Sequence, residues 1–317
     1  MLGAFRVLGK ACSRIEWSLA VRRAFALTGR FLRQAQARRR PFPTNPPPVW
    51  TKVFVWAYNV ARLTLGFQGV AGASGLWLDA RPLEARSCMK LYERIRHALF
   101  LSRPNRFIAM CRGLEGEPLC CHVKNTGRLG ELLVSGAEVV LAEQDAPGRK
   151  TAFDLVAVYR DGRIFNIDSQ APNKIVGRAL VQGWLGFVPQ RLLPEYRQGD
   201  SRFDFAFVQG ERLGYVEVKG VTLEREGLAL FPDAPTQRGI KHLEGLARLA
   251  QTGAQAHAVF VLQFSGATAF SPNQETHPAF AEALRAARAS GVVLHAVPCR
   301  VSPDGMELAP LELPILL

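Results

Sequence analysis

The feature that most constrains the fold of this sequence is a pair of alternating segments separated by a short turn. Residues 202–208 read Arg-Phe-Asp-Phe-Ala-Phe-Val, and residues 215–219 read Tyr-Val-Glu-Val-Lys. Because successive side chains of a strand point to opposite faces, the three phenylalanines are expected on one face and Asp204 on the other. Gly210-Glu211 suits a two-residue turn that prefers glycine first, so the two segments are predicted to form a β-hairpin.

The two-residue turn also fixes the register of this hairpin. Phe205 is then opposite Val216, and Asp204 is opposite Glu217. Two carboxylates so opposed have Cβ atoms about 4.5–5.5 Å apart and repel each other. Lys219, on the same face as Glu217, is one compensating group, and a hard divalent cation held by both carboxylates is another.

This pairing of two carboxylates with an ammonium suits metal-assisted phosphodiester hydrolysis. The ion polarises a phosphoryl oxygen and lowers the pKa of a bound water, while the ammonium of Lys219 orients that water or stabilises the growing negative charge. The structural alternative is an ordinary ion pair between Glu217 and Lys219 on an exposed strand, which contributes only ~0–1 kcal/mol.

Helical and strand patterns alternate around the hairpin and predict an α/β domain over residues 169–317. Apolar spacing predicts a helix over 173–181 with Asn173 as N-cap, a helix over 236–251 capped by Thr236, and a helix over 278–290. The predicted strands cover residues 191–197, 202–209, 213–219, 256–263 and 292–297.

A small β domain is predicted before it, over residues 89–168. Short runs rich in Val, Leu, Phe and Ile are separated by turns that contain glycine, and Asp161-Gly162 is a strong hairpin signal. The expected strands cover residues 105–111, 118–124, 137–143, 152–160 and 163–167. Five such strands fit an OB-like barrel, a fold that often binds single strands through basic and aromatic side chains.

One turn of this barrel is a candidate anion site. Asn125-Thr126-Gly127-Arg128 is polar and contains a glycine, so its backbone N–H groups are expected to face an anion while Arg128 reaches a phosphate.

Positive charge is concentrated at the start of the chain. The net charge is +13, but residues 1–88 hold 14 basic and 3 acidic side chains, against 26 and 24 in residues 89–317. A proline cluster at 41–48 excludes regular structure there, and the uncharged stretch 63–78 is shorter than the ~18–20 residues that a bilayer requires. The segment is interpreted as an extension outside the folded core. An upstream start with Met89 as the functional one, a basic tail, a weak membrane-surface segment and a transit peptide remain open.

Six cysteines without a C-x-x-C pair indicate neither a disulfide framework nor a paired zinc knuckle. Cys120 and His122 share a strand face, but plain burial is the simpler interpretation of the pair. A reduced, cytoplasmic compartment is therefore expected. No stable membrane association is expected, and a homodimer remains open.

Several motifs, taken together, resemble the sugar fermentation stimulation (SfsA) family. They occur in the family's order between about residues 103 and 310. The motifs are Asn125-Thr126-Gly127-Arg128, Arg149-Lys150-Thr151, Pro172-Asn173, Gly199-Asp200-Ser201-Arg202-Phe203-Asp204-Phe205, Tyr215-Val216-Glu217-Val218-Lys219, the stretch from Phe231-Pro232-Asp233 to Arg238-Gly239, and Lys241-His242-Leu243.

The resemblance implies an OB-like domain followed by an α/β domain of the restriction-endonuclease-like PD-(D/E)xK fold. In that fold Asp204 and Glu217 would be the metal ligands, with Mg²⁺ or Mn²⁺ as the ion, and Lys219 the catalytic lysine. Gln263 would orient a ligand or water. The family is described as binding DNA without strong sequence preference and as linked to expression of genes for sugar use, notably of maltose.

The analogy places DNA contacts on both domains. They would come from Lys124 and Arg128 on the barrel and from Arg202, Arg238 and Lys241 near the acidic face. The leading hypothesis is therefore a DNA-binding protein with a nuclease-like site. The alternative is a regulatory factor that has kept the site but not the reaction. An enzyme of small-molecule sugar metabolism is less favoured, because no nucleotide-binding loop of the type G-x-x-x-x-G-K-[ST] occurs.

Overall fold

The computed structural model describes residues 88–145 and 148–317. The predicted extension over residues 1–88 therefore lies, apart from Cys88, outside the described residues. Within those two ranges no helix is both long and apolar enough to span a membrane.

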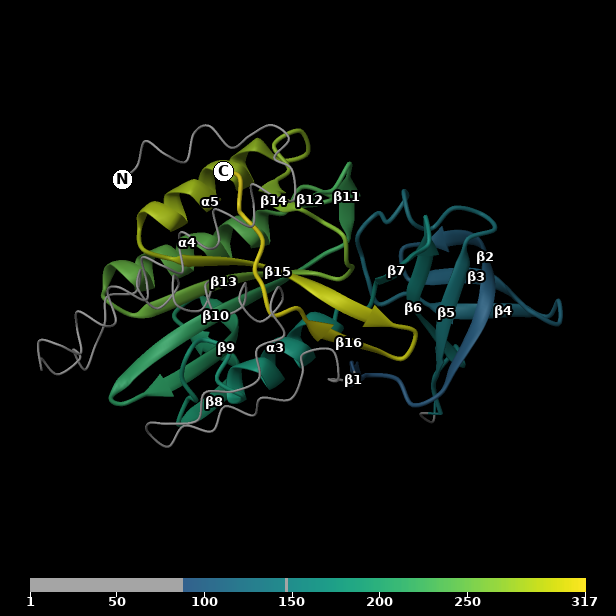
Figure 1. Ribbon diagram of the computed structural model, residues 1–317, viewed down its shortest axis with the longest axis horizontal. Coiled ribbons are helices and arrows are strands. Elements are labelled where there is room, and N and C mark those ends of the chain that lie inside the picture. The colour runs from purple at the N-terminus through teal and green to yellow at the C-terminus, as the bar shows by residue number, and fades with distance from the viewer. Residues whose placement is uncertain (1–87, 146–147) are drawn as a thin grey trace, which may run out of the picture. The chain divides into compact units, whose positions relative to one another are not determined.

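The first folded part is a closed β-barrel, as predicted (Figure 1). Strand β4 pairs with both β3 and β6, and β5 pairs with β2 and β6, so five strands form a ring to which β7 is added. The strands are β2 (Ile95–Asn105), β3 (Ile108–Gly113), β4 (Pro118–His122), β5 (Glu138–Glu143), β6 (Phe153–Arg160) and β7 (Arg163–Asn166). The sequence prediction missed β2 and began β3 three residues too early.

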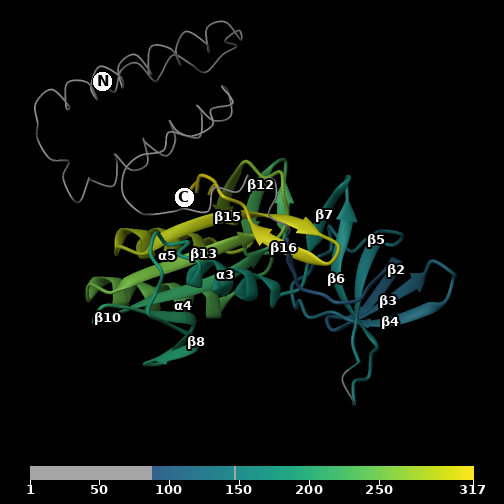
Figure 2. The ribbon, with the colours of Figure 1, turned by 60° about the horizontal axis from the view of Figure 1, so that its bottom comes forward.

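The second folded part is an α/β domain around a seven-stranded sheet (Figures 1 and 2). The strand order is β1-β16-β15-β13-β10-β9-β8, and β10, β13 and β15 run parallel. The strands are β1 (Met89–Lys90), β8 (Arg191–Gln198), β9 (Ser201–Gln209), β10 (Arg212–Val221), β13 (Gln255–Leu262), β15 (Val293–Ser302) and β16 (Gly305–Leu308). A smaller sheet contains β11 (Leu223–Arg225), β12 (Leu228–Phe231) and β14 (Ala269–Pro272).

Helices cover both faces of the large sheet. Helix α3 (Ala171–Val181) packs on the face that carries Val216, Val259 and Val261. Helices α4 (Gln237–Gln251) and α5 (Pro278–Ala289) lie beside each other on the opposite face (Figure 1). The hairpin with the acidic residues therefore lies in the middle of the domain, between α3 and α4.

Two hairpins form as predicted. In the barrel, Asp161 and Gly162 adopt φ values of +50° and +71°, as a tight primed turn requires. Between β9 and β10, Gly210 has a φ of +62° and Phe205 pairs with Val216. The register predicted for the acidic hairpin is thus confirmed as far as this pair.

The predicted placement of the three phenylalanines is wrong at one position. Phe205 packs on α3, where a Cβ added to Gly177 would lie 3.0 Å from its ring. Phe203 packs on α4 instead, where a Cβ on Gly245 would lie 3.1 Å from its ring. The alternation of the strand therefore breaks at Asp204, the residue between them.

One helix start is confirmed and another is corrected. The Thr236 hydroxyl caps α4 by accepting a hydrogen bond from the N–H of Gly239 at 3.0 Å. Helix α3 begins at Ala171, before Pro172, so Asn173 is not its N-cap. Proline is favoured in the first turn of a helix because its missing N–H would have no partner there. The amide of Asn173 is thereby free for another contact.

A buried histidine pair predicts a loss of stability in mild acid. His257 Nδ1 lies 3.1 Å from Nε2 of His295, whose Nδ1 lies 2.9 Å from the Glu312 carboxylate. Burial and the neighbouring His295 lower the pKa of His257 to about 4. As the pH falls through about 6.5, His257 binds a proton in the unfolded chain but stays neutral in the folded chain. The free energy of unfolding therefore decreases with decreasing pH.

We expect the free energy of unfolding to drop by about 2 kcal/mol from pH 7 to pH 5 through His257 alone. Urea titrations at both pH values measure it, and His257→Gln is expected to remove most of the difference. A wild-type difference that persists undiminished in His257→Gln would contradict this assignment.

Candidate functional site

Glu217 is the most buried carboxylate of the candidate site. It lies in the middle of β10 with 2% of its surface exposed. Its Oε1 atom accepts hydrogen bonds from Lys219 Nζ at 2.5 Å and from His242 Nδ1 on α4. Burial raises the pKa of Glu217, but the hydrogen bond from His242 and the charge of Lys219 outweigh it, and the net shift is downward. Glu217 is thus held as a carboxylate.

The other oxygen of Glu217, Oε2, is buried and has no hydrogen-bond partner among the described residues. Buried carboxylate oxygens normally accept a hydrogen bond or bind a cation, so Oε2 is free to contact a ligand.

Asp204 is held beside it by two hydrogen bonds. Its Oδ2 accepts from the backbone N–H of Val218 at 2.7 Å, and its Oδ1 accepts from the side chain of Asn173 at 2.7 Å. Burial and the negative charge of Glu217 raise the pKa of Asp204. Asp204, Glu217 and Lys219 are therefore close enough to influence one another electrostatically, while Asn173 and His242 reach the two carboxylates from helices on opposite faces of the sheet.

Two residues of this site were not predicted. His242 follows Lys241 on the predicted helix, and Asn173 was assigned to a helix cap. His242 lies on the apolar face of the helix, which could have indicated that it is buried. A buried histidine needs a polar partner, so a contact with a polar group could have been expected. Only the structure shows that Glu217 is this partner.

The donor set fits a hard divalent cation. Asp204 and Glu217 provide carboxylate oxygens, one of them unpartnered, and hard cations prefer oxygen ligands. Residues 88–145 and 148–317 contain no group of three or more His, Cys, Asp or Glu side chains able to hold a metal. A cation here would therefore need water, backbone or substrate oxygens as its other ligands, which is the usual arrangement for Mg²⁺.

Gln263 lies at the joint between the barrel and the α/β domain, where its side-chain oxygen contacts Gly220, the residue after Lys219 in β10. Its Nε2 donates to Asn166 Oδ1 and to the carbonyl oxygen of Asp168, both at 3.0 Å. Phe264 stacks on Phe165 of the barrel at the same joint, with ring centroids 4.8 Å apart. The amide nitrogen of Gln263 thus connects the two folded parts, and the catalytic role expected for Gln263 stays a prediction.

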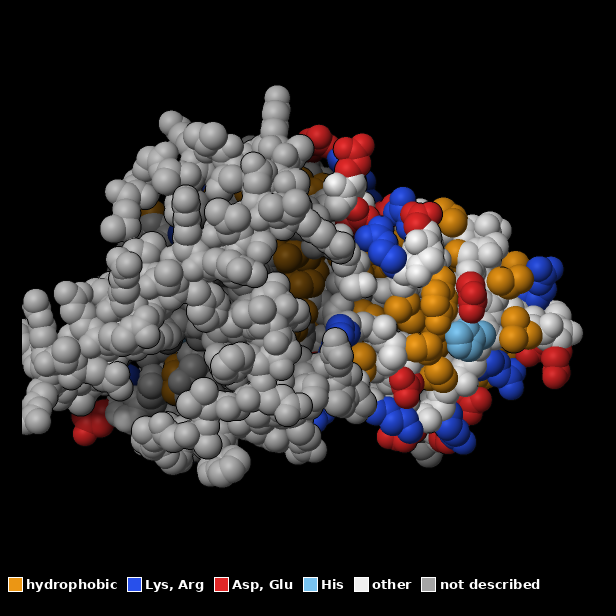
Figure 3. Space-filling model, in the orientation of Figure 1, with side chains coloured by type: hydrophobic (Ala, Val, Ile, Leu, Met, Phe, Trp, Pro, Cys, Tyr) orange, Lys and Arg blue, Asp and Glu red, His pale blue; other side chains and the backbone are white. Residues whose placement is uncertain are grey.

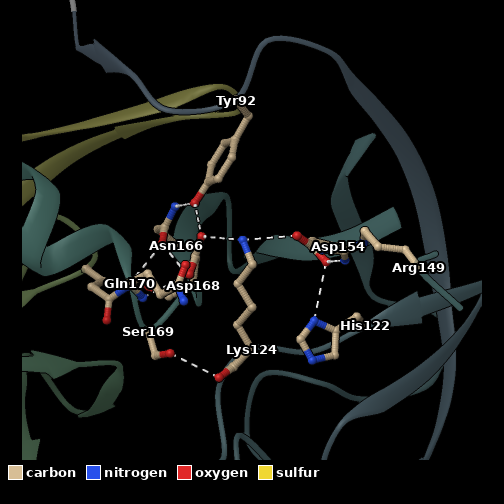
Figure 4. Close-up of polar contacts among 10 residues, drawn as sticks. Tyr92, His122, Lys124, Arg149, Asp154, Asn166, Asp168, Ser169 and Gln170 are labelled. Carbon is tan, nitrogen blue, oxygen red and sulfur yellow. Dashed lines mark hydrogen bonds and ion pairs between the residues drawn. The ribbon is translucent and has the colours of Figure 1, made fainter. Parts of the chain in front are cut away.

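Lys124, predicted as a DNA contact, is enclosed in a polar network at this joint (Figure 4). Its Nζ lies 3.0 Å from Asp154 and 3.3 Å from Asp168, two carboxylates with at most 1% of their surface exposed. The Tyr92 hydroxyl donates to Asp168, and burial raises the pKa of Tyr92 so that it stays protonated. Arg149 pairs with Asp154 from the other side. The ammonium of Lys124 is thus paired with two buried carboxylates, which argues against direct contact with DNA.

Two backbone N–H groups of the predicted anion-binding turn already donate hydrogen bonds to side chains of the protein. The N–H of Gly127 donates to Asn125 Oδ1 at 2.8 Å, and the N–H of Arg128 donates to Asp233 Oδ2 at 3.0 Å. These N–H groups are not open to an external anion, contrary to the prediction. The side chain of Arg128 itself is exposed.

The other predicted DNA-binding residues are on the surface of the α/β domain. Arg238 and Lys241 are exposed on α4, the helix that also carries His242. Arg202 is exposed on β9 and lies 3.5 Å from Glu195. On the face of the barrel shown in Figure 3, hydrophobic side chains lie among charged side chains of both signs. Nucleic-acid binding would therefore depend on local clusters and not on a uniformly positive surface.

Comparisons with known proteins match both folded parts. The model of the SfsA N-terminal OB domain matches residues 101–167, and that of the sugar fermentation stimulation protein RE domain matches residues 170–305. A sugar fermentation stimulation protein homolog of Desulfitobacterium hafniense is 47% identical over 216 residues, covering 68% of this chain and 94% of the homolog. One from Clostridium beijerinckii is 42% identical over 217 residues, covering 68% and 96%.

A solved structure agrees with these matches. SfsA of Pyrococcus furiosus, determined in complex with Ca²⁺, superimposes with a TM-score of 0.67 and 26% identity, covering 74% of this chain and all of that one. The chain therefore belongs to the sugar fermentation stimulation protein family.

Proposed function

We propose that this protein binds DNA without strong sequence preference and hydrolyses its phosphodiester bonds with a divalent cation at Asp204 and Glu217. The observation that carries the proposal is the buried, unpartnered Oε2 of Glu217 beside a second carboxylate and the ammonium of Lys219. Two negative groups so close in a protein interior favour a cation between them.

The chain's own residues have separate roles in this proposal. Asp204 and Glu217 hold the cation, while Asn173 and His242 fix the orientation of the two carboxylates. Lys219, with a fifth of its side chain exposed, is available to orient the attacking water or to stabilise charge on the phosphate. When bound, Mg²⁺ or Mn²⁺ would polarise the phosphate and lower the pKa of a water. The Ca²⁺ in the structure of the Pyrococcus furiosus relative supports a hard cation.

The test is incubation of the full chain with linear and circular DNA in Mg²⁺, Mn²⁺ or EDTA. We expect cleavage with Mg²⁺ or Mn²⁺ and none in EDTA. Lys219→Met is expected to abolish it, while Lys174→Met, which removes an exposed lysine from α3, should cut like wild type. Equal cutting by Lys219→Met would point to a contaminating nuclease.

A non-catalytic regulatory factor is the second candidate. The observation in its favour is that Lys219 and His242 already contact Glu217, so part of the negative charge is compensated without a metal. This alternative predicts DNA binding in gel shifts and no cleavage with either ion. The genes it would act on, by analogy with the family, are those for sugar use.

We further predict that His242 acts by positioning Glu217. His242→Leu removes the hydrogen bond to Oε1 and is expected to reduce the cleavage rate about 10- to 100-fold, the usual effect of losing a partner of a metal ligand. His242→Asn can place an amide N–H near the position of Nδ1 and is expected to restore most of that rate.

The measurement is the initial rate of plasmid nicking at saturating DNA, together with the affinity for DNA. Affinity should stay within about twofold in both variants, because His242 is buried behind Glu217. Equal losses of activity in His242→Leu and His242→Asn would show that the hydrogen bond is not what matters.

A further inference from the structure

A single aromatic ring stands out on the surface of the barrel. Phe107 is 44% exposed and is the sole aromatic among the exposed large hydrophobic side chains of residues 88–145 and 148–317. It lies in the two-residue turn Arg106-Phe107 between β2 and β3. A lone exposed apolar side chain is ordinary on a protein surface, so the case for a binding role rests on the cationic and hydrogen-bonded groups around this ring.

The backbone of this turn is held by two local hydrogen bonds. Asn105 Oδ1 accepts hydrogen bonds from the N–H groups of Phe107 and Ile108, at 2.9 and 3.0 Å, which fixes the turn. The guanidinium carbon of Arg106 lies 4.9 Å from the ring centroid, at cation–π distance. The turn therefore presents a flat aromatic and a flat cation together.

Arg103 connects this turn to residues 125–128. Its guanidinium donates to the carbonyl oxygens of Arg106 and Asn125, each at 2.7 Å, and to those of Gly127 and Arg128, at 2.8 and 2.9 Å. Four hydrogen bonds from one side chain make the two turns a preorganised surface. The backbone of the exposed residue Arg128 is thereby linked to the turn of Arg106 and Phe107.

The turn of residues 125–128 borders a hollow that it shares with strand β10. Asn125 and Asp233 line a small hollow of about 40 Å³, whose wall includes Gly220. Gly220 directly follows Lys219 in β10. The turn of residues 125–128 therefore lies near the strand that carries Lys219.

We propose that Arg106 and Phe107 form a stacking platform for an unpaired base of single-stranded or locally melted DNA, with Arg128 beside the adjacent phosphate. The proposal rests on the proposed function insofar as DNA is the partner, and it defines the form of DNA that is preferred. A planar ring and a guanidinium stack on the face of a base, and in an intact duplex the base faces are covered by their neighbours.

The test compares the affinity of the full chain for two probes by fluorescence anisotropy, in EDTA and again in Ca²⁺. The probes are a labelled thymidine oligomer of about 12 nucleotides, within the ~4–16 that one OB fold covers, and a duplex of equal length. Phe107→Ala and Phe107→Leu are expected to weaken binding of the single strand about fivefold or more. Phe107→Trp should preserve it, and duplex binding should change less than twofold.

The control is Leu114→Ala. Leu114 is 75% exposed in the turn at the other end of β3 and should have no effect on either probe. Retention of affinity in Phe107→Leu would show a merely hydrophobic contact and overturn the stacking proposal, as would an equal loss for both probes.

The results separate this proposal from the proposed function. If wild type binds neither probe, DNA is not the partner and both fail. If wild type cleaves DNA while Phe107→Ala binds the single strand normally, only the platform is wrong. If the Phe107 variants behave as expected and wild type never cleaves, the platform stands without the nuclease.

Discussion

Replacing Glu217 by glutamine is expected to slow DNA cleavage about 100-fold or more. Removing one group that stabilises charge at a reacting centre typically has an effect of this size. The variant keeps the size of the side chain but removes the charge that would hold a cation together with Asp204. Asp204→Asn is expected to have an effect of the same order. Initial rates of plasmid nicking in Mn²⁺ measure both variants against wild type.

The matched control for this prediction is Glu244→Gln. Glu244 is exposed on α4, the helix of His242, so its replacement removes one negative charge without touching the site. It should cut at the wild-type rate. Because the single effects arise from one shared cation, we expect the double variant Asp204→Asn/Glu217→Gln to be little slower than either single one. Undiminished cleavage by the double variant would place the reaction elsewhere.

Lys124→Met is expected to lower the free energy of unfolding by about 3 kcal/mol. The change leaves Asp168 buried without its cation, and removing one partner of a buried ion pair costs roughly 3–5 kcal/mol. The lower end applies because Arg149 still pairs with Asp154. Urea denaturation followed by circular dichroism measures this difference.

Two further variants sharpen the test of Lys124. Lys124→Met/Asp168→Asn removes the unpaired charge and should recover part of the lost stability, while Lys174→Met should stay within about 0.5 kcal/mol of wild type. If Lys124→Met is as stable as wild type and instead binds DNA more weakly, Lys124 is a DNA contact, as the resemblance to the family implied.

Much of the fold could be predicted from local patterns. The acidic hairpin, its register as far as Phe205 and Val216, and the cap of α4 at Thr236 follow from turn chemistry and helix capping, which act over a few residues. Strand β2 was missed because basic and apolar residues alternate irregularly in it, and its partners β3 and β5 stabilise it. The early start of α3 was missed because a proline was taken as a break and not as part of a first turn.

The candidate site was predictable only in its centre. Asp204, Glu217 and Lys219 lie on neighbouring strands, so their spacing brings them together. His242 is 25 residues from Glu217, and no local rule connects them. The contacts of Gln263 and Lys124 were not predicted for a related reason. Asn166 and Asp168 contact Gln263 from the other folded part, and Asp154 and Asp168 lie far from Lys124 in the sequence.

The central claim is that Asp204 and Glu217 together bind a divalent cation, and calorimetric titration of the full chain with Mn²⁺ tests it most directly. We expect a binding event in wild type that disappears in Asp204→Asn/Glu217→Gln and remains in Glu244→Gln. Identical Mn²⁺ titrations for wild type and the double variant would contradict the claim, whatever the chain does to DNA.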